Sequence, residues 1–143
     1  MTFEIAKKED LGFVLAIGKD RILHWPLTYK DLCFYLQDND IGLFKLVLDN
    51  SIIGYIILRY ELDEAEIDEI AISRQHEGKG IGTYLLEKAL QNLKTRNFKK
   101  IYLEVRKKNL RAIRLYEKNG FKPYRIRKNY YGDDDAICYL KEL

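Results

Sequence analysis

The sequence predicts an α+β fold with a mixed sheet, and three observations support this prediction. The expected elements follow the order β-α-α-β-β-β-α-β-α-β-β, in which strands dominate. Only one compact unit runs from a strand through a glycine-rich turn and a helix into the next strand, so an all-parallel sheet is not expected. The length of 143 residues suits one domain, and no repeat, linker or low-complexity segment interrupts it. We therefore expect a single domain over residues 1–143.

Elements in the first half of the chain are predicted from periodicity and from local signals at their ends. Thr28 can cap a helix, and Asp31 three residues later gives a weak form of the capping box. Asp49 and Asn50 form a good two-residue turn between two aliphatic, β-branched segments, which predicts a hairpin. The expected strands cover residues 2–5, 41–48, 51–62 and 65–72, and the expected helices cover residues 10–20 and 29–37.

The second half begins with the most clearly predicted helix, over residues 80–95. Its apolar residues form one stripe with a period near 3.6, consisting of Ile81, Leu85, Leu86, Ala89, Leu90 and Leu93. Residues 100–105 alternate as a strand does, and Asn109 can cap a further helix that ends at Asn119 and Gly120. Residues 122–127 and 136–140 are expected to form the last hairpin.

Composition and charge exclude several classes of function. No apolar run approaches the ~20 residues that a membrane span needs, and the amino terminus lacks a secretory signal, so we expect a cytoplasmic protein. Cys33 and Cys138 fit no metal-ligand spacing, so we expect reduced thiols and no metal. The net charge of +3 fits either solvated basic faces or attraction to a phosphorylated cofactor. No basic and aromatic motif supports nucleic-acid binding.

Three glycines at alternate positions, Gly78, Gly80 and Gly82, mark the passage from a strand to a helix. Glycine permits a tight backbone turn and a close approach to a ligand. The unsatisfied N–H groups at a helix start and the helix dipole together form a site for phosphate oxygens, and Lys79 adds a positive charge. The spacing fits neither a P-loop nor a dinucleotide fingerprint. The alternative is a glycine-rich turn that binds no ligand.

The glycine turn has a family context. The strand end Ile70-Ala71-Ile72, followed by the turn and an amphipathic helix, resembles the acetyl-CoA motif of the GCN5-related N-acetyltransferases (GNAT). Glu77 departs from the family pattern, which has Gln or Arg at this position. The resemblance implies a mixed, mostly antiparallel sheet of six to seven strands flanked by about four helices. It implies that acetyl-CoA contacts Ile70, Ala71, Ile72, Gly78, Lys79, Gly80, Ile81, Gly82 and Thr83.

The carboxy-terminal third resembles the RimI branch of this family, the bacterial ribosomal-protein-alanine N-acetyltransferases. The resemblance rests on the segments 102–106, 112–121 and 127–131, together with Asn109. It implies that Glu104 is the catalytic proton acceptor, Tyr116 the proton donor and Asn109 a cofactor contact. It also implies that Tyr130 and Tyr131 help to hold the acceptor peptide. We expect Glu69 to belong to the substrate-binding region as well.

Each of these assignments has an alternative based on the residues themselves. Glu104 can instead be a solvent-facing carboxylate paired with Arg106, and Tyr116 can be a packed core tyrosine. Glu66 and Glu69 are rivals of Glu104 for the role of catalytic base. Strand alternation places Glu66 and Glu69 on opposite faces, so at most one of them is expected to line the site.

Two other expectations concern aromatic and histidine side chains. The same alternation argument predicts that Tyr130 or Tyr131, but not both, touches the substrate. His24 and His76 lack the partners of a nucleophilic site, so they are expected to be surface or packing residues.

Three functions remain after these arguments. The first is direct transfer from acetyl-CoA, in a ternary complex, to the N-terminal α-amine of a ribosomal or other protein. The second is the same chemistry on a small amine, namely a polyamine, an amino acid or an aminoglycoside. The third is an acyl-CoA-binding module without catalysis. We expect a monomer or a weak homodimer that binds neither nucleic acid nor membrane.

Overall fold

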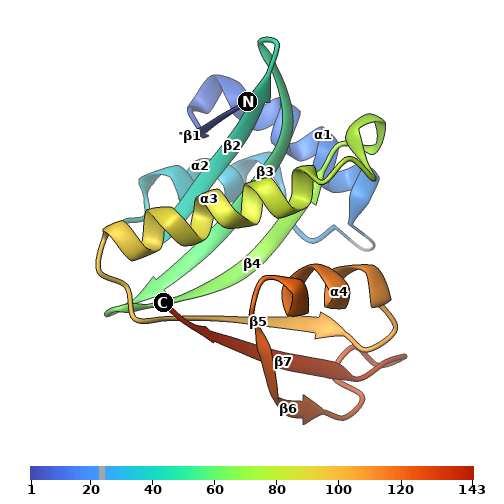
Figure 1. Ribbon diagram of the computed structural model, residues 1–143. Coiled ribbons are helices and arrows are strands. Elements are labelled where there is room, and N and C mark those ends of the chain that lie inside the picture. Colours follow the sequence, from blue (N-terminus) through green and yellow to red (C-terminus); the bar gives the residue numbers. More distant parts are fainter. Residues whose placement is uncertain (23–24) are drawn as a thin grey trace.

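The computed structural model describes residues 1–22 and 25–143. Within these two ranges the chain forms seven strands and four α-helices, which confirms the predicted mixed fold (Figure 1). The strands are β1 (Thr2–Ile5), β2 (Ile41–Leu48), β3 (Ser51–Glu61), β4 (Glu64–Ile72), β5 (Lys100–Arg106), β6 (Lys122–Arg127) and β7 (Ala136–Glu142). The helices are α1 (Leu11–Arg21), α2 (Tyr29–Gln37), α3 (Ile81–Thr95) and α4 (Leu110–Lys118). None of the described helices is long and apolar enough to cross a membrane.

Local signals set several of these boundaries as the sequence predicts. The Thr28 hydroxyl accepts a hydrogen bond from the Asp31 N–H at 3.1 Å, and the Asp31 carboxylate accepts one from the Thr28 N–H at 2.8 Å. This reciprocal pair is the capping box that starts α2. Asp49 and Asn50 both have positive φ, at 49° and 63°, as the turn of a tight hairpin requires.

The sheet has the strand order β1-β2-β3-β4-β5-β7-β6, and only the contact between β4 and β5 is parallel. That parallel contact is short, because its paired residues run only from Glu64 opposite Lys100 to Ile67 opposite Leu103. Both strands continue beyond these pairs and diverge (Figure 1). A gap therefore opens in the middle of the sheet, beside the carboxyl ends of β4 and β5.

Helices cover both faces of the sheet. One face packs against α3 and α4 in a core that includes Leu85 and Leu86 of α3, Tyr116 of α4 and Leu103 of β5. The other face packs against α1 and α2, with Tyr55 of β3 completely buried there. The diverging ends of β4 and β5 are thus held between two hydrophobic cores, one on each face of the sheet.

A β-bulge in β4 changes which side chains share a face. Ile57 lies opposite Glu69, but the next residue, Leu58, lies opposite Ile67, so Asp68 is an extra residue in β4. Glu66 lies opposite Arg59, on the same face as Glu69. The prediction that alternation separates Glu66 from Glu69 is therefore wrong, because the bulge shifts the period by one residue.

Candidate functional site

The glycine turn between β4 and α3 has the backbone of a phosphate site. Gly78 and Gly80 adopt φ values of +76° and +77°, a region that side chains with a Cβ rarely adopt. Gly80 is the N-cap of α3 and supplies no side-chain cap, and the first helical hydrogen bond runs from the Tyr84 N–H to the Gly80 carbonyl at 3.2 Å. The first turn of α3, residues 81–83, therefore directs N–H groups toward the turn, which suits the phosphates of acetyl-CoA.

The carboxyl end of β4 has one backbone edge directed at the gap. Ile70, Ala71 and Ile72 pair with β3 along their other edge. Their side chains alternate between the two cores, with Ile70 and Ile72 on the α3 side and Ala71 on the α1 side. The edge beside β5 thus presents peptide groups to an extended chain, which fits the amide-bearing arm of acetyl-CoA.

Glu77, the residue that departs from the family pattern, is held by two guanidinium groups. Its carboxylate lies 3.0 Å from Nη2 of Arg21, the last residue of α1, and also pairs with Arg111 in the first turn of α4. These ion pairs connect the glycine turn to both neighbouring helices. Neither arginine was identified from the sequence, because each lies far from Glu77 along the chain and in no recognisable motif.

Two carboxylates stand just beyond the paired part of β4 and β5, one on each strand. Ile67 and Leu103 are the last paired residues, Glu69 is two residues beyond Ile67, and Glu104 directly follows Leu103. Glu66 is in register with Tyr102, so Glu104, two residues beyond Tyr102, lies on the same face as Glu66 and Glu69. The structure thus brings together, on one face of the sheet, the carboxylates that the sequence left as rivals.

Glu69 lies in an environment that raises the pKa of its carboxyl group. Burial, with a smaller contribution from the charge of Asp68, raises the pKa of Glu69 to about 7. A hydrogen bond donated by the Tyr55 phenol at 3.2 Å acts in the opposite direction and reduces the rise. Glu69 therefore changes its protonation state near neutral pH. Tyr55 was not predicted as a site residue, because nothing distinguishes it from the other residues of an apolar strand.

Glu104 lies in a cluster that differs from the sequence-based alternative. Its partner is Arg127, whose Nε lies 3.0 Å from Oε1, and the Cys138 Sγ lies 3.8 Å from the same oxygen. Arg106 instead pairs with Asp133 at 2.7 Å, so the Glu104–Arg106 pair of the alternative interpretation is not formed. Arg127 belongs to the segment 127–131, which carries part of the RimI resemblance. This resemblance was the one feature of the sequence that could have identified Arg127 as a site residue.

Tyr130 and Tyr131 lie in the turn between β6 and β7, not on a strand. Their rings are 5.1 Å apart and nearly perpendicular. The Glu104 carboxylate raises the pKa of Tyr130, and Tyr131 packs under the Arg106 guanidinium at 4.2 Å. The alternation argument for these two tyrosines is therefore wrong, because both lie in a turn beside the Glu104 cluster.

Tyr116 is a core residue that also adjoins this cluster. It is only 6% exposed and packs edge-on against Phe121, with ring centroids 5.7 Å apart. Burial, together with the nearby Tyr131, raises the pKa of Tyr116 above its ordinary value, so the phenol keeps its proton. Asn109 caps the same helix, because its Oδ1 accepts a hydrogen bond from the Ala112 N–H at 3.2 Å, as predicted.

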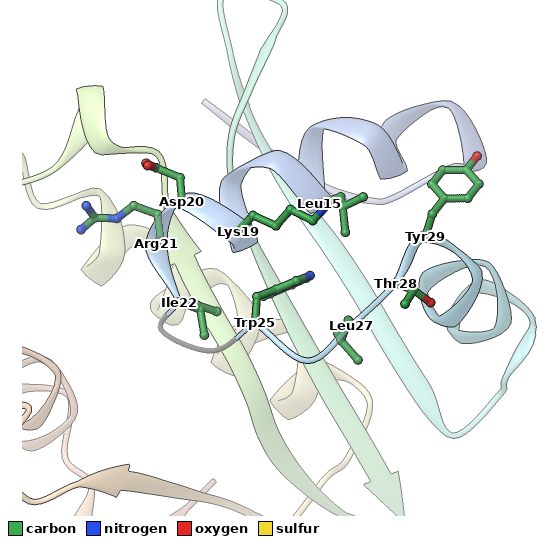
Figure 2. A pocket seen from close by; sticks show the side chains of 9 residues that line it. All are labelled: Leu15, Lys19, Asp20, Arg21, Ile22, Trp25, Leu27, Thr28 and Tyr29. Carbon is green, nitrogen blue, oxygen red and sulfur yellow. The ribbon is translucent and has the colours of Figure 1, made fainter. Parts of the chain in front are cut away.

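A pocket of about 720 Å³ lies between the end of α1 and the start of α2 (Figure 2). Trp25 lines it and meets the Tyr55 ring edge-on at 6.1 Å, which connects the pocket to the hydroxyl that contacts Glu69. The ionic side chains around it are Lys19, Asp20 and Arg21. His76 has a packing role, with Nδ1 2.8 Å from the Ser73 hydroxyl, whereas His24 lies outside the described residues.

Comparisons with known proteins agree with this arrangement. The model of the Acetyltransferase (GNAT) family matches residues 12–121. An N-alpha-acetyltransferase from Saccharolobus solfataricus is 33% identical over 158 residues, which cover 99% of this chain and 93% of the relative. The ribosomal protein bS18-alanine N-acetyltransferase of Haemophilus influenzae is 43% identical over 104 residues, which cover 67% of this chain and 70% of the relative.

A solved structure extends the likeness to three dimensions. The crystal structure of the ribosomal-protein-S18-alanine N-acetyltransferase from Escherichia coli matches with a TM-score of 0.90 at 30% identity. The match covers 99% of this chain and 92% of that one. The chain therefore belongs to the Acetyltransferase (GNAT) family, and it is an N-acetyltransferase that resembles the ribosomal-protein-alanine branch.

Proposed function

We propose that this enzyme transfers the acetyl group of acetyl-CoA directly to the N-terminal α-amine of a protein, in a ternary complex. The observation that carries the proposal is the gap between β4 and β5, which has a phosphate-binding turn at one end and carboxylates on one face. Relatives named for acetylation of protein N-termini and of a ribosomal protein support this acceptor class. A ribosomal acceptor implies that the enzyme works in the cytoplasm.

The residues around the gap hold the cofactor and align it. The glycine turn and the first turn of α3, including Ile81, Gly82 and Thr83, direct N–H groups at the phosphates, and the exposed Lys79 adds charge. The edge of β4 at Ile70–72 orients the extended arm, and Asn109 holds the start of α4 beside it. Acetyl-CoA would supply the thioester, whose acetyl group passes to the amine through attack at the carbonyl carbon, with coenzyme A as the leaving group.

The acceptor must lose a proton before it attacks. Deprotonating an α-amine with a pKa of about 7.8 costs about 1 kcal/mol at pH 7, whereas a lysine near 10.4 costs about 4.6 kcal/mol. A modest base is therefore enough for a protein N-terminus. We assign this role to Glu104, whose carboxylate forms an ion pair with Arg127 at 3.0 Å, and we assign Glu69, on the same face of the sheet, as a contact for the amine.

The leaving sulfur needs a proton at the end of the reaction. Tyr116 is protonated at neutral pH, as an ordinary phenol is, and burial raises its pKa further; it stands in α4 close to Tyr131 of the Glu104 cluster. We therefore assign the proton donor role to Tyr116. Tyr130 and Tyr131 form the rim of the same cluster and are the proposed contacts for the acceptor peptide.

A decisive experiment compares acceptors. The wild-type enzyme with acetyl-CoA is given a peptide that begins with alanine, the same peptide with a blocked amino terminus and an internal lysine, and spermidine. We expect acetylation of the free α-amine only, because its deprotonation at pH 7 costs far less than that of a lysine or polyamine amine with a pKa of about 10. Activity on spermidine alone would refute the peptide assignment, and binding of acetyl-CoA without any turnover would indicate a non-catalytic binding module.

The same assay separates the two carboxylates. Glu104→Gln is expected to lower kcat by about 100-fold or more, since general-base catalysis contributes about 10²–10⁴-fold. Glu69→Gln is expected to raise KM for the peptide more than it lowers kcat. The opposite pattern, with kcat lost in Glu69→Gln and retained in Glu104→Gln, would transfer the role of base to Glu69.

A further inference from the structure

The ion pairs of Glu77 stand at the phosphate end of the proposed acetyl-CoA site. Glu77 immediately precedes Gly78, and its carboxylate pairs with Arg21 at 3.0 Å and with Arg111. Arg111 follows the capping residue Asn109 by two positions, so it stands at the amino-terminal end of α4. One carboxylate is therefore shared by two guanidinium groups beside backbone N–H groups that suit anions.

These side chains differ in exposure. The side chain of Arg111 is 62% exposed, that of Glu77 is 30% exposed and that of Arg21 is 20% exposed, so Arg111 is the most accessible of the three. The ion pair with Arg111 is weak, because water screens it. The pyrophosphate of coenzyme A carries two negative charges against one on a carboxylate, and like a carboxylate it accepts bidentate hydrogen bonds from arginine, so it is the stronger partner in the same setting.

We infer, on the basis of the proposed acetyl-CoA site, that Glu77 acts as a built-in substitute for a phosphate group. In the free enzyme its carboxylate occupies Arg21 and Arg111, and bound coenzyme A takes over these two arginines. Glu77 therefore competes with the cofactor for its phosphate contacts. This assigns Arg21 and Arg111 as phosphate ligands and makes Glu77 a residue that weakens cofactor binding.

The test is a comparison of dissociation constants by titration calorimetry, with coenzyme A as the probe. Glu77→Gln is expected to bind coenzyme A about three- to tenfold more tightly than the wild type, because each exposed ion pair that must be exchanged is worth up to about fivefold. Glu87→Gln removes the same charge from the exposed face of α3 and is the matched control. Its dissociation constant is expected to stay within about twofold of the wild type.

Two further measurements identify the partners. Arg111→Ala is expected to weaken coenzyme A binding, and to do so more strongly in the Glu77→Gln background, where nothing occupies the arginine beforehand. Pantetheine, which lacks the phosphates, is expected to bind the wild type and Glu77→Gln equally. Far-UV circular dichroism of each variant establishes that it remains folded.

The possible results separate this inference from the proposed function. If the wild type binds coenzyme A and Glu77→Gln binds it equally or more weakly, the inference is overturned and the cofactor site stands. A parallel change in pantetheine affinity would likewise overturn it, because the effect would not come from the phosphates. If the wild type binds no coenzyme A, the proposed function and the inference both fall.

Discussion

Replacement of Glu69 by glutamine tests the electrostatics of the gap between β4 and β5. The half-buried carboxyl has a pKa of about 7 in the folded protein, against an ordinary value of 4.5. The fold therefore favours the neutral form. As pH rises through the window from 4.5 to about 7, the unfolded chain ionises first, and the folded protein must then hold an unfavourable carboxylate. The free energy of unfolding of the wild type should fall across this window, whereas the variant, whose glutamine stays neutral, should not lose stability in this way.

The size of the effect follows from these two values. A rise from 4.5 to about 7 corresponds to a difference of about 3.4 kcal/mol between the protonation states. Glu69 is only partly buried, so solvent screening reduces this figure, and we expect about 1.5 kcal/mol. The hydrogen bond from Tyr55 is retained in the variant, because the glutamine carbonyl also accepts it.

The assay is urea unfolding of the wild type and Glu69→Gln at pH 4 and at pH 8.5. The free energy of unfolding of the variant minus that of the wild type should be about 1.5 kcal/mol higher at pH 8.5 than at pH 4, so the variant is relatively more stable at the higher pH. The difference between the two proteins cancels the titration of all other groups. Glu61→Gln, at an exposed position of β3, is the control and should show no such dependence. An equal difference at both pH values for Glu69→Gln would refute the assignment of a raised pKa.

Two further predictions concern helix starts. Asn109→Ala should lower the free energy of unfolding, measured in urea, by about 1 kcal/mol, because α4 loses its cap. Asn109→Ser should retain most of the wild-type stability, because serine also caps helices. Equal losses in the two variants would contradict the capping role. Asp10→Ala should lower the free energy of unfolding by about 3 kcal/mol, because it leaves Lys45, the partner of Asp10 at 2.7 Å, buried without a counter-charge. Burial opposes ionisation of Asp10, but hydrogen bonds from Lys45 and the Lys7 N–H outweigh it and lower the pKa of Asp10 below 3.8. The difference in free energy of unfolding between the wild type and the variant should therefore shrink as pH falls below this value, and a difference that stays constant down to pH 2 would rule out this mechanism.

Features that depend on a few consecutive residues could be predicted from the sequence. The capping box of Thr28 and Asp31 and the hairpin turn at Asp49 and Asn50 are local, because their partners lie within three residues. The strand-to-helix passage at Gly80 is local in the same sense, since its φ of +77° is a property of one residue. The mixed sheet followed from the order of such elements.

Features that depend on pairing across the sheet could not be predicted. The bulge at Asp68 is a property of the register between β3 and β4, and nothing in β4 alone indicates it. The partners of Glu77 and Glu104 are arginines from other elements, which the fold brings into contact. A strand pattern gives the direction of a side chain only while the strand and its register are regular. For this reason the predictions from alternation failed for Glu66 and Glu69 and for Tyr130 and Tyr131, all of which lie around the candidate site.

The shortness of the β4–β5 pairing also has a consequence for the dynamics of the enzyme. Strands β1–β4 pair with strands β5–β7 through just the four residue pairs from Glu64–Lys100 to Ile67–Leu103, and one more backbone hydrogen bond, from the Lys99 N–H to the Asp63 carbonyl at 2.7 Å, lies at the end of this seam. We expect amide hydrogen exchange to divide the free enzyme at this seam into two cooperative units. A ligand whose own amides pair with the edge of β4 would act as an additional strand across the seam. Binding would then slow exchange on both sides of the seam, so that the substrate completes the sheet that holds it.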